Sequence, residues 1–237
     1  MHRKLFSCIR KEIREPMTTL GRASGSPGAE EYAATESSIA VRILGISGSL
    51  RGRSSNTELL RAVAMLAPTN VQIALFSGLD KLPYFNPDID GEGIAPPPSV
   101  RILRRSIDWA DTLLICSPEY AHGVPGVLKN ALDWLVSFPD ILHKPVGLLN
   151  ASPRATHAQA SLAETLRTMS MKVVPGASIA VPLLGRGLDA PAIASDEHLA
   201  VALHGVIAAL VRAAAHYRAS TTFMMGSDAG NHYKAAQ

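Results

Sequence analysis

The chain has 237 residues, 47% of them hydrophobic and 18% charged, so it can bury a large core and is not a disordered or collagen-like polypeptide. Its formal charge of +3, with no stretch that mixes Lys and Arg with aromatic residues, disfavours nucleic-acid binding. The two cysteines, Cys8 and Cys116, are too few for a disulfide scaffold and lack the spacing of metal ligands, which favours a reducing, cytoplasmic location.

Both ends of the chain lack a sustained hydrophobic period. Residues 1–38 end in a small, polar stretch and are predicted to form a disordered extension, with Met17 as an alternative start. The alternative is a targeting or partner-binding arm, although no apolar segment typical of a secretory signal follows its basic residues. Residues 221–237 are predicted as a second disordered tail, which leaves residues 39–220 for the domain.

Between these ends, short apolar runs alternate with amphipathic stretches. The predicted strands are 41–47, 71–76, 112–116, 145–150 and 177–181, and the predicted helices are 56–67, 99–110, 125–136, 157–169 and 196–217. Such alternation predicts an α/β fold, a five-stranded, doubly wound parallel sheet with right-handed crossovers and helices on both faces. The apolar run in the last helix is interrupted by His204 and Arg212, so we expect a packed helix and no membrane span.

The turn after the first predicted strand is rich in groups that bind anions. Ser49, Ser54 and Ser55 supply hydroxyls, Arg51 supplies a planar guanidinium, and Asn56 is a good N-cap for the helix that follows. In an open α/β sheet, ligands bind beyond the carboxyl ends of the strands, and a helix N-terminus favours an anion. The turn therefore predicts a phosphate site, the alternative being an ordinary polar turn capped by Asn56.

The segment after the third predicted strand is typical of a loop that borders a flat ligand. Pro118 stops the strand, while Tyr120 and His122 offer ring surface. Glu119 is a candidate general base, but a lone carboxylate beside a turn is more often a structural hydrogen-bond acceptor.

The turn after the fourth predicted strand carries Ser152, Arg154, Thr156 and His157. It is either a third wall of the same crevice or a capping turn with Thr156 as N-cap. The sequence shows no metal-ligand cluster and no nucleophile elbow, and Cys116, in a buried strand, is expected to be inert.

Two of these segments carry a family resemblance. Residues 48–56 match the pattern G-S-L-R-x-x-S-x-N, and residues 118–134 match P-E-Y-x-x-x-x-P-G-x-L-K-N-A-L-D-W. On these motifs, and on L-P-Y-F-N-P-D at 82–88, the chain from 41 to 218 resembles the NADPH-dependent FMN reductase family, a flavodoxin-like group that includes quinone, azo-dye and chromate reductases. The resemblance implies a flavodoxin-like sheet of order 2-1-3-4-5 and a homodimer or homotetramer.

The resemblance also implies roles for single residues. It implies that FMN phosphate is held by Ser49, Arg51, Ser54 and Asn56, and that the isoalloxazine is bordered by the loop of Pro118, Glu119, Tyr120 and His122. The turn after the fourth strand, which contains Ser152 and Arg154, flanks the ring in the family but is usually Ser/Gly-rich, which leaves its role open here. Ala121 also departs from the family, where Asn is frequent.

The expected reaction needs no catalytic side chain, because FMN carries the chemistry. Hydride from NADPH or NADH would reduce FMN, and a quinone, azo, chromate or flavin acceptor would then take two electrons in a ping-pong sequence. One alternative is a flavodoxin-type electron carrier, although such carriers are usually acidic and this chain has a pI near 9.0. Another is a flavin-bound sensor that uses residues 1–38.

Overall fold

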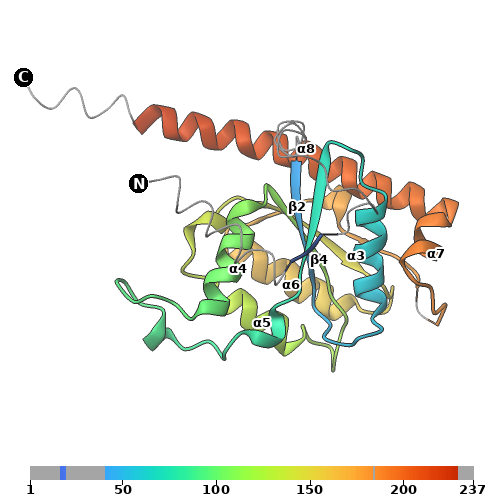
Figure 1. Ribbon diagram of the computed structural model, residues 1–237, viewed down its shortest axis with the longest axis horizontal. Coiled ribbons are helices and arrows are strands. Elements are labelled where there is room, and N and C mark those ends of the chain that lie inside the picture. Colours follow the sequence, from blue (N-terminus) through green and yellow to red (C-terminus); the bar gives the residue numbers. More distant parts are fainter. Residues whose placement is uncertain (1–16, 20–40, 184, 229–237) are drawn as a thin grey trace, which may run out of the picture.

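The computed structural model describes residues 17–19, 41–183 and 185–228, with side chains from 41 onward up to residue 220. A central parallel sheet lies between two layers of helices (Figure 1). Its main strands coincide with those predicted: β2 (Val41–Ser47), β3 (Val71–Phe76), β4 (Thr112–Cys116) and β5 (Pro145–Asn150). The prediction of a doubly wound α/β fold is therefore confirmed.

The parallel strands lie in the order β3-β2-β4-β5, followed by two short strands that both pair with β5. These are β6 (Lys172–Val173) and β7 (Ile179–Ala180), where the sequence predicted one strand over 177–181. The 3₁₀ turn η4 (Pro175–Ala177) separates them, because the proline has no N–H to donate to a continuous ladder. Counted in chain order with β6 and β7 as one position, the sheet has the expected flavodoxin-like order 2-1-3-4-5.

Two described elements lie within the segments that the sequence predicted as extensions. Strand β1 (Met17–Thr19), inside the segment 1–38, pairs antiparallel with the outer edge of β3, where unpaired backbone groups are available. Helix α8 (Glu197–Asp228) continues into the predicted tail 221–237, because no proline follows Arg218 to stop it. The other residues of 1–38 and 229–237 lie outside the described residues.

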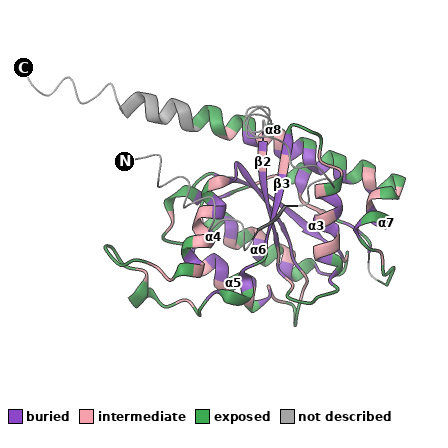
Figure 2. Cartoon of the chain, in the orientation of Figure 1, coloured by how far each residue is buried: buried purple, intermediate pink, exposed green. Residues whose placement is uncertain are grey.

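Among the described residues, three helices cover each face of the sheet. The first layer contains α3 (Ser55–Met65), α7 (Ala190–Ser195) and α8, and the second contains α4 (Pro98–Trp109), α5 (Gly126–Asp133) and α6 (Thr156–Thr168). Alternate residues of β4 pack against opposite layers, Leu114 and Cys116 on the first and Leu113 and Ile115 on the second. The central strands are accordingly largely buried (Figure 2), and β4 is buried at every residue, as its unbroken apolar sequence predicts.

Helix α8 lies across the first layer with one face on the sheet (Figure 1). Leu203, Leu210 and Ala214 on that face are buried, whereas Val201 is 67% exposed. The segment Glu197–Ser220 is long and apolar enough to cross a membrane by length and composition alone, a test that core helices of soluble proteins also pass. Its packing against the sheet agrees with the predicted packed helix.

Candidate functional site

A cavity of about 380 Å³ lies at the carboxyl edge of the sheet, between the turns after β2 and β5 and the loop after β4. It is at the point where the strand order reverses between β2 and β4, where open α/β sheets bind ligands. Nearly all predicted site residues line it: Ser49, Arg51, Ser54, Ser55, Asn56, Pro118, Glu119, Tyr120, Ser152 and Arg154. His122 is not in the wall and joins the site through Glu119.

One end of the cavity is the start of α3. The helix begins at Ser55, and Ser54 occupies the N-cap position in extended backbone without a side-chain capping bond. The first N–H groups of a helix have no partner within it, so they are suited to an anion. The guanidiniums of Arg51 and Arg53 are exposed beside this helix start. Hydroxyls, guanidiniums and an uncapped helix N-terminus together form a donor set that fits a phosphate dianion.

Asn56 is not the N-cap that the sequence predicted. The helix starts one residue before it, and its buried side chain turns inward beneath the cavity. Its Oδ1 accepts hydrogen bonds from Cys116 Sγ at 3.1 Å and from Ala151 N at 3.4 Å. Asn56 therefore links the start of α3 to the ends of β4 and β5. Burial raises the pKa of the Cys116 thiol, so the thiol stays protonated, in agreement with the inert role expected for it.

Glu119 acts as a structural acceptor, one of the two alternatives that the sequence left open. Its Oε2 accepts from the backbone N–H of Ala158 in the first turn of α6 at 2.8 Å, and its Oε1 contacts His122 Nδ1 at 3.0 Å. The Ala158 hydrogen bond, followed by His122, lowers the pKa of Glu119 and keeps it ionised. Thr156 is not the N-cap, because α6 begins at Thr156 itself and Ala155 holds the cap position.

The loop after β4 contains a tight turn with unusual backbone angles. Tyr120 and Gly123 exchange backbone hydrogen bonds of 3.2 and 2.9 Å, and the two residues between them, Ala121 and His122, have φ values of 49° and 59°. Positive φ at both central positions is typical of a type I′ turn, which normally takes Asn or Gly. The turn brings the His122 ring to 4.4 Å from the His157 ring, centroid to centroid, in an edge-on arrangement.

Sequence reasoning missed some of the residues that shape the cavity. Arg53 lines it beside Arg51. Asn150, the last residue of β5, orders the next turn: its Nδ2 donates to Ala155 O at 3.0 Å, and its Oδ1 accepts from Ser152 N at 2.8 Å. An amide side chain at the end of a buried, otherwise apolar strand is the signal that could have identified Asn150.

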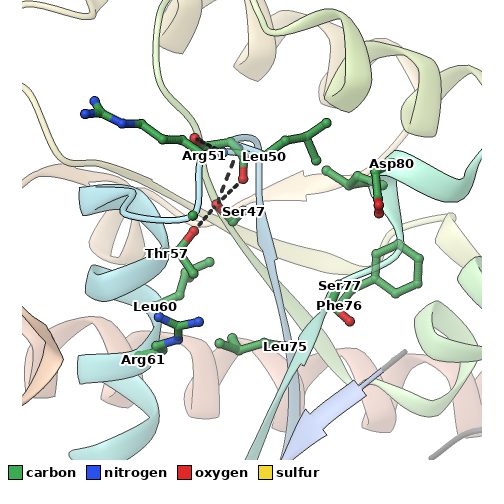
Figure 3. A pocket seen from close by; sticks show the side chains of 13 residues that line it. Ser47, Leu50, Arg51, Thr57, Leu60, Arg61, Leu75, Phe76, Ser77 and Asp80 are labelled. Atoms are coloured by element: carbon green, nitrogen blue, oxygen red, sulfur yellow. Dashed lines mark hydrogen bonds between the residues drawn. The ribbon is translucent and has the colours of Figure 1, made fainter. Parts of the chain in front are cut away.

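A second cavity of about 310 Å³ lies on the other side of the turn after β2, facing the end of β3 (Figure 3). Leucine side chains, Phe76 and Asp80 line it, and a hydrogen bond of 2.8 Å joins Ser47 Oγ to Thr57 Oγ1 along one wall. Ser49 and Arg51 line both cavities. The turn after β2 is therefore the wall between them.

Two segments that carry the family resemblance contact one another. Asn130 Nδ2 and Trp134 Nε1 donate to Pro83 O at 2.9 and 2.8 Å, and Asn130 Oδ1 accepts from Phe85 N at 2.8 Å. The Trp134 and Phe85 rings meet edge-to-face with centroids 5.1 Å apart. Helix α5 thereby holds the Pro-rich loop after β3 in place.

A doubly wound sheet with a helix start suited to an anion and a tight-turned loop at its switch point is the architecture of a flavodoxin-like flavin-binding protein. Residues 41–183, more than half of the chain, match the profile of the NADPH-dependent FMN reductase family. The chain belongs to this family of oxidoreductases. This membership confirms the predicted FMN-dependent NAD(P)H oxidoreductase activity and its cofactors.

Individual relatives agree with this membership. An NAD(P)H-dependent FMN reductase of Pseudomonas aeruginosa is 38% identical over 131 residues, which cover 53% of this chain and 69% of the relative. A quinone reductase of Escherichia coli is 33% identical over 114 residues, or 47% of this chain and 60% of the relative. Among solved structures, the flavoenzyme NAD(P)H:(acceptor) oxidoreductase of Paracoccus denitrificans has a TM-score of 0.60 and 27% identity, covering 75% of this chain and 98% of the other.

Proposed function

We propose that this protein binds FMN in the cavity between β2, β4 and β5, with the phosphate at the start of α3 and the isoalloxazine against the loop of Pro118, Glu119 and Tyr120. One observation carries the proposal: a single cavity joins an uncapped helix N-terminus, lined by hydroxyls and guanidiniums, to a loop in which two residues are fixed at positive φ. Its volume, about 380 Å³, is within the range of small-molecule sites.

The reaction we propose is a ping-pong transfer of two electrons from NADPH or NADH to a small acceptor. FMN supplies the hydride chemistry, so the chain's own task is to bind and orient it. Names of relatives, which include FMN reductases and quinone reductases, support a quinone or a flavin as the acceptor. Azo compounds and chromate remain predicted acceptors. Preference between NADPH and NADH is not set by any group that we identify in the described residues.

The proposal is tested by adding FMN to the purified protein. Bound flavin absorbance should appear, and the loaded protein should oxidise NADPH steadily with a quinone and no partner protein. Initial rates at several concentrations of both substrates should give the parallel double-reciprocal lines of a ping-pong mechanism. A protein that stays colourless with FMN contradicts the proposed site.

The two alternatives give different results in the same assay. A flavodoxin-type carrier would bind FMN but would not turn over without a partner protein. A sensor that depends on the N-terminal segment would lose its response when residues 1–16 are removed, a deletion that leaves β1 in place. An enzyme should keep its activity in that variant. The homodimer or homotetramer, the domain limits 39–220 and the cytoplasmic location remain predictions.

A further inference from the structure

Three side chains form a cluster beside the cavity wall. His122 Nδ1 lies 3.0 Å from Glu119 Oε1, and the His157 ring meets the His122 ring edge-on with centroids 4.4 Å apart. The Glu119 side chain is 11% exposed, whereas that of His122 is 76% exposed. Glu119 lines the cavity, so the cluster connects the cavity to solvent. The family resemblance places His122 in the loop that borders the isoalloxazine, but FMN binding as proposed above uses the acid–base chemistry of neither histidine.

The contact with Glu119 determines what His122 can do. A carboxylate is an acceptor only, so His122 donates its Nδ1–H to Glu119. Glu119 remains an anion, because the Ala158 N–H, and then His122 itself, lower its pKa. The other nitrogen, Nε2, is then the one through which the ring can donate a proton to a ligand. The positive φ of His122 and the two backbone bonds between Tyr120 and Gly123 hold the backbone of the turn, and the contacts with Glu119 and His157 orient the ring.

Quinone reduction needs a proton as well as a hydride. Transfer of hydride to a quinone gives the hydroquinone monoanion, and one proton must then reach its oxygen. A positioned side chain with a titration range near neutral pH accelerates such a step. One-electron acceptors such as ferricyanide take no proton.

We propose that His122 is the proton donor to the hydroquinone, with Glu119 and His157 as the residues that position it. In this step the Nε2–H bond of the imidazolium breaks and an O–H bond forms on the hydroquinone. His122 is left neutral with its remaining proton on Nδ1, facing Glu119. Water then returns a proton to Nε2 through the exposed side of the ring. The assignment rests on the proposed function, since it requires a quinone to be reduced here.

The test is His122→Gly, assayed with a quinone and with ferricyanide. Glycine adopts positive φ without strain, so the turn is preserved. We expect the quinone kcat to fall by about 100-fold, the lower end of general acid catalysis, because solvent can also supply protons. Ferricyanide reduction should fall far less, the FMN dissociation constant should change by less than about 3-fold, and added imidazole should restore part of the quinone rate.

His143→Gly is the matched control. His143 is also exposed and also has positive φ, at 60°, but it precedes β5 at the opposite edge of the sheet. The His143→Gly variant should reduce both the quinone and ferricyanide at wild-type rates.

A measurement without turnover tests the positioning role of Glu119. In ¹⁵N NMR spectra, neutral His122 should carry its proton on Nδ1 in the wild type and shift toward the Nε2–H form in Glu119→Gln. The assignment is overturned if His122→Gly reduces the quinone at the wild-type rate, loses both acceptors equally or does not respond to imidazole. A wild-type protein that binds no FMN or reduces neither acceptor contradicts the proposed function itself.

Discussion

The two edges of the sheet differ in whether their charged side chains have partners within the protein. At the amino edge, the buried carboxylate of Asp111 accepts from the guanidiniums of Arg42 and Arg218. Beside it, the buried Lys144 Nζ donates to Ile107 O at 3.1 Å and Ala110 O at 2.6 Å, closing the end of α4. Here each charge has partners within the protein.

At the carboxyl edge, three arginines around the cavity are without such partners. Within the described part of the chain, Arg51, Arg53 and Arg154 make no ion pair, and α3 begins without a side-chain cap. Charges with protein partners contribute to stability, whereas free donors around a cavity are available to a ligand. Substitutions at the two edges should therefore separate ligand binding from folding.

The largest effect is expected for Arg51→Ala. In the proposed site it removes a charge-assisted hydrogen bond to the FMN phosphate, so it should weaken FMN binding by about 1.5–3 kcal/mol, with little change in thermal stability. Titration of the purified variant with FMN measures this. Arg101→Ala, at an exposed position on α4, should bind FMN like the wild type. An unchanged dissociation constant in the Arg51 variant would remove this residue from the phosphate site.

Asp111→Asn should have the reverse profile. It breaks the ion pairs with Arg42 and Arg218, which are themselves about 40% exposed and can be rehydrated. We expect a loss of about 2 kcal/mol in the free energy of unfolding and an unchanged FMN dissociation constant. Denaturant unfolding together with FMN titration checks both. If FMN binding also weakened, the two edges would be coupled.

Asp111 should also make the stability of the folded protein depend on pH. Burial alone would raise the pKa of Asp111, but the hydrogen bonds from Arg218 and Arg42 together outweigh it, so its pKa lies below 3.8. A carboxyl with a lowered pKa in the folded state contributes stability that is full above the unfolded pKa and is lost as pH falls through the folded pKa. Unfolding curves from pH 5 to pH 3 should thus converge for wild type and Asp111→Asn as the pH falls.

A smaller effect of opposite sign is expected at Ala121. Its φ of 49° is strained for alanine, whereas asparagine tolerates this region. Ala121→Asn should stabilise the protein by about 1 kcal/mol, measured by denaturant unfolding. Ala160→Asn, at an exposed position in the regular part of α6, should instead be slightly destabilising. A destabilised Ala121→Asn variant would show that the turn does not store strain.

The smallest effect is expected for Lys129→Ala. Lys129 forms an ion pair with Asp133 one turn along α5, and both side chains are partly exposed. Such a pair contributes about 0.3 kcal/mol, so unfolding should be nearly unchanged at low salt. A decrease of more than about 1 kcal/mol in the free energy of unfolding would show that this pair contributes to stability as the ion pairs at the amino edge do.

The sequence predicted the parallel strands β2 to β5 to the residue, because each is a short, mainly apolar run between turn signals. It also predicted ten of the fourteen residues that line the cavity, since strand ends determine which turns meet. The sequence did not predict hydrogen bonds whose two partners come from distant segments of the chain. Glu119 takes the capping role at α6 that Thr156 was considered for, and Asn56 binds the ends of β4 and β5 instead of capping α3. Local propensity does not report such contacts.

The thiol of Cys116 has a chemical consequence for an enzyme of this kind. Quinones are electrophiles that alkylate thiolates. Flavin enzymes that react with oxygen release hydrogen peroxide, and peroxide oxidises thiolates. Cys116 lies beneath the cavity floor, fully enclosed, with its proton directed at Asn56. With the quinone acceptor proposed above, the protein therefore keeps a protonated sulfur atom beneath its site that neither the quinone nor peroxide attacks.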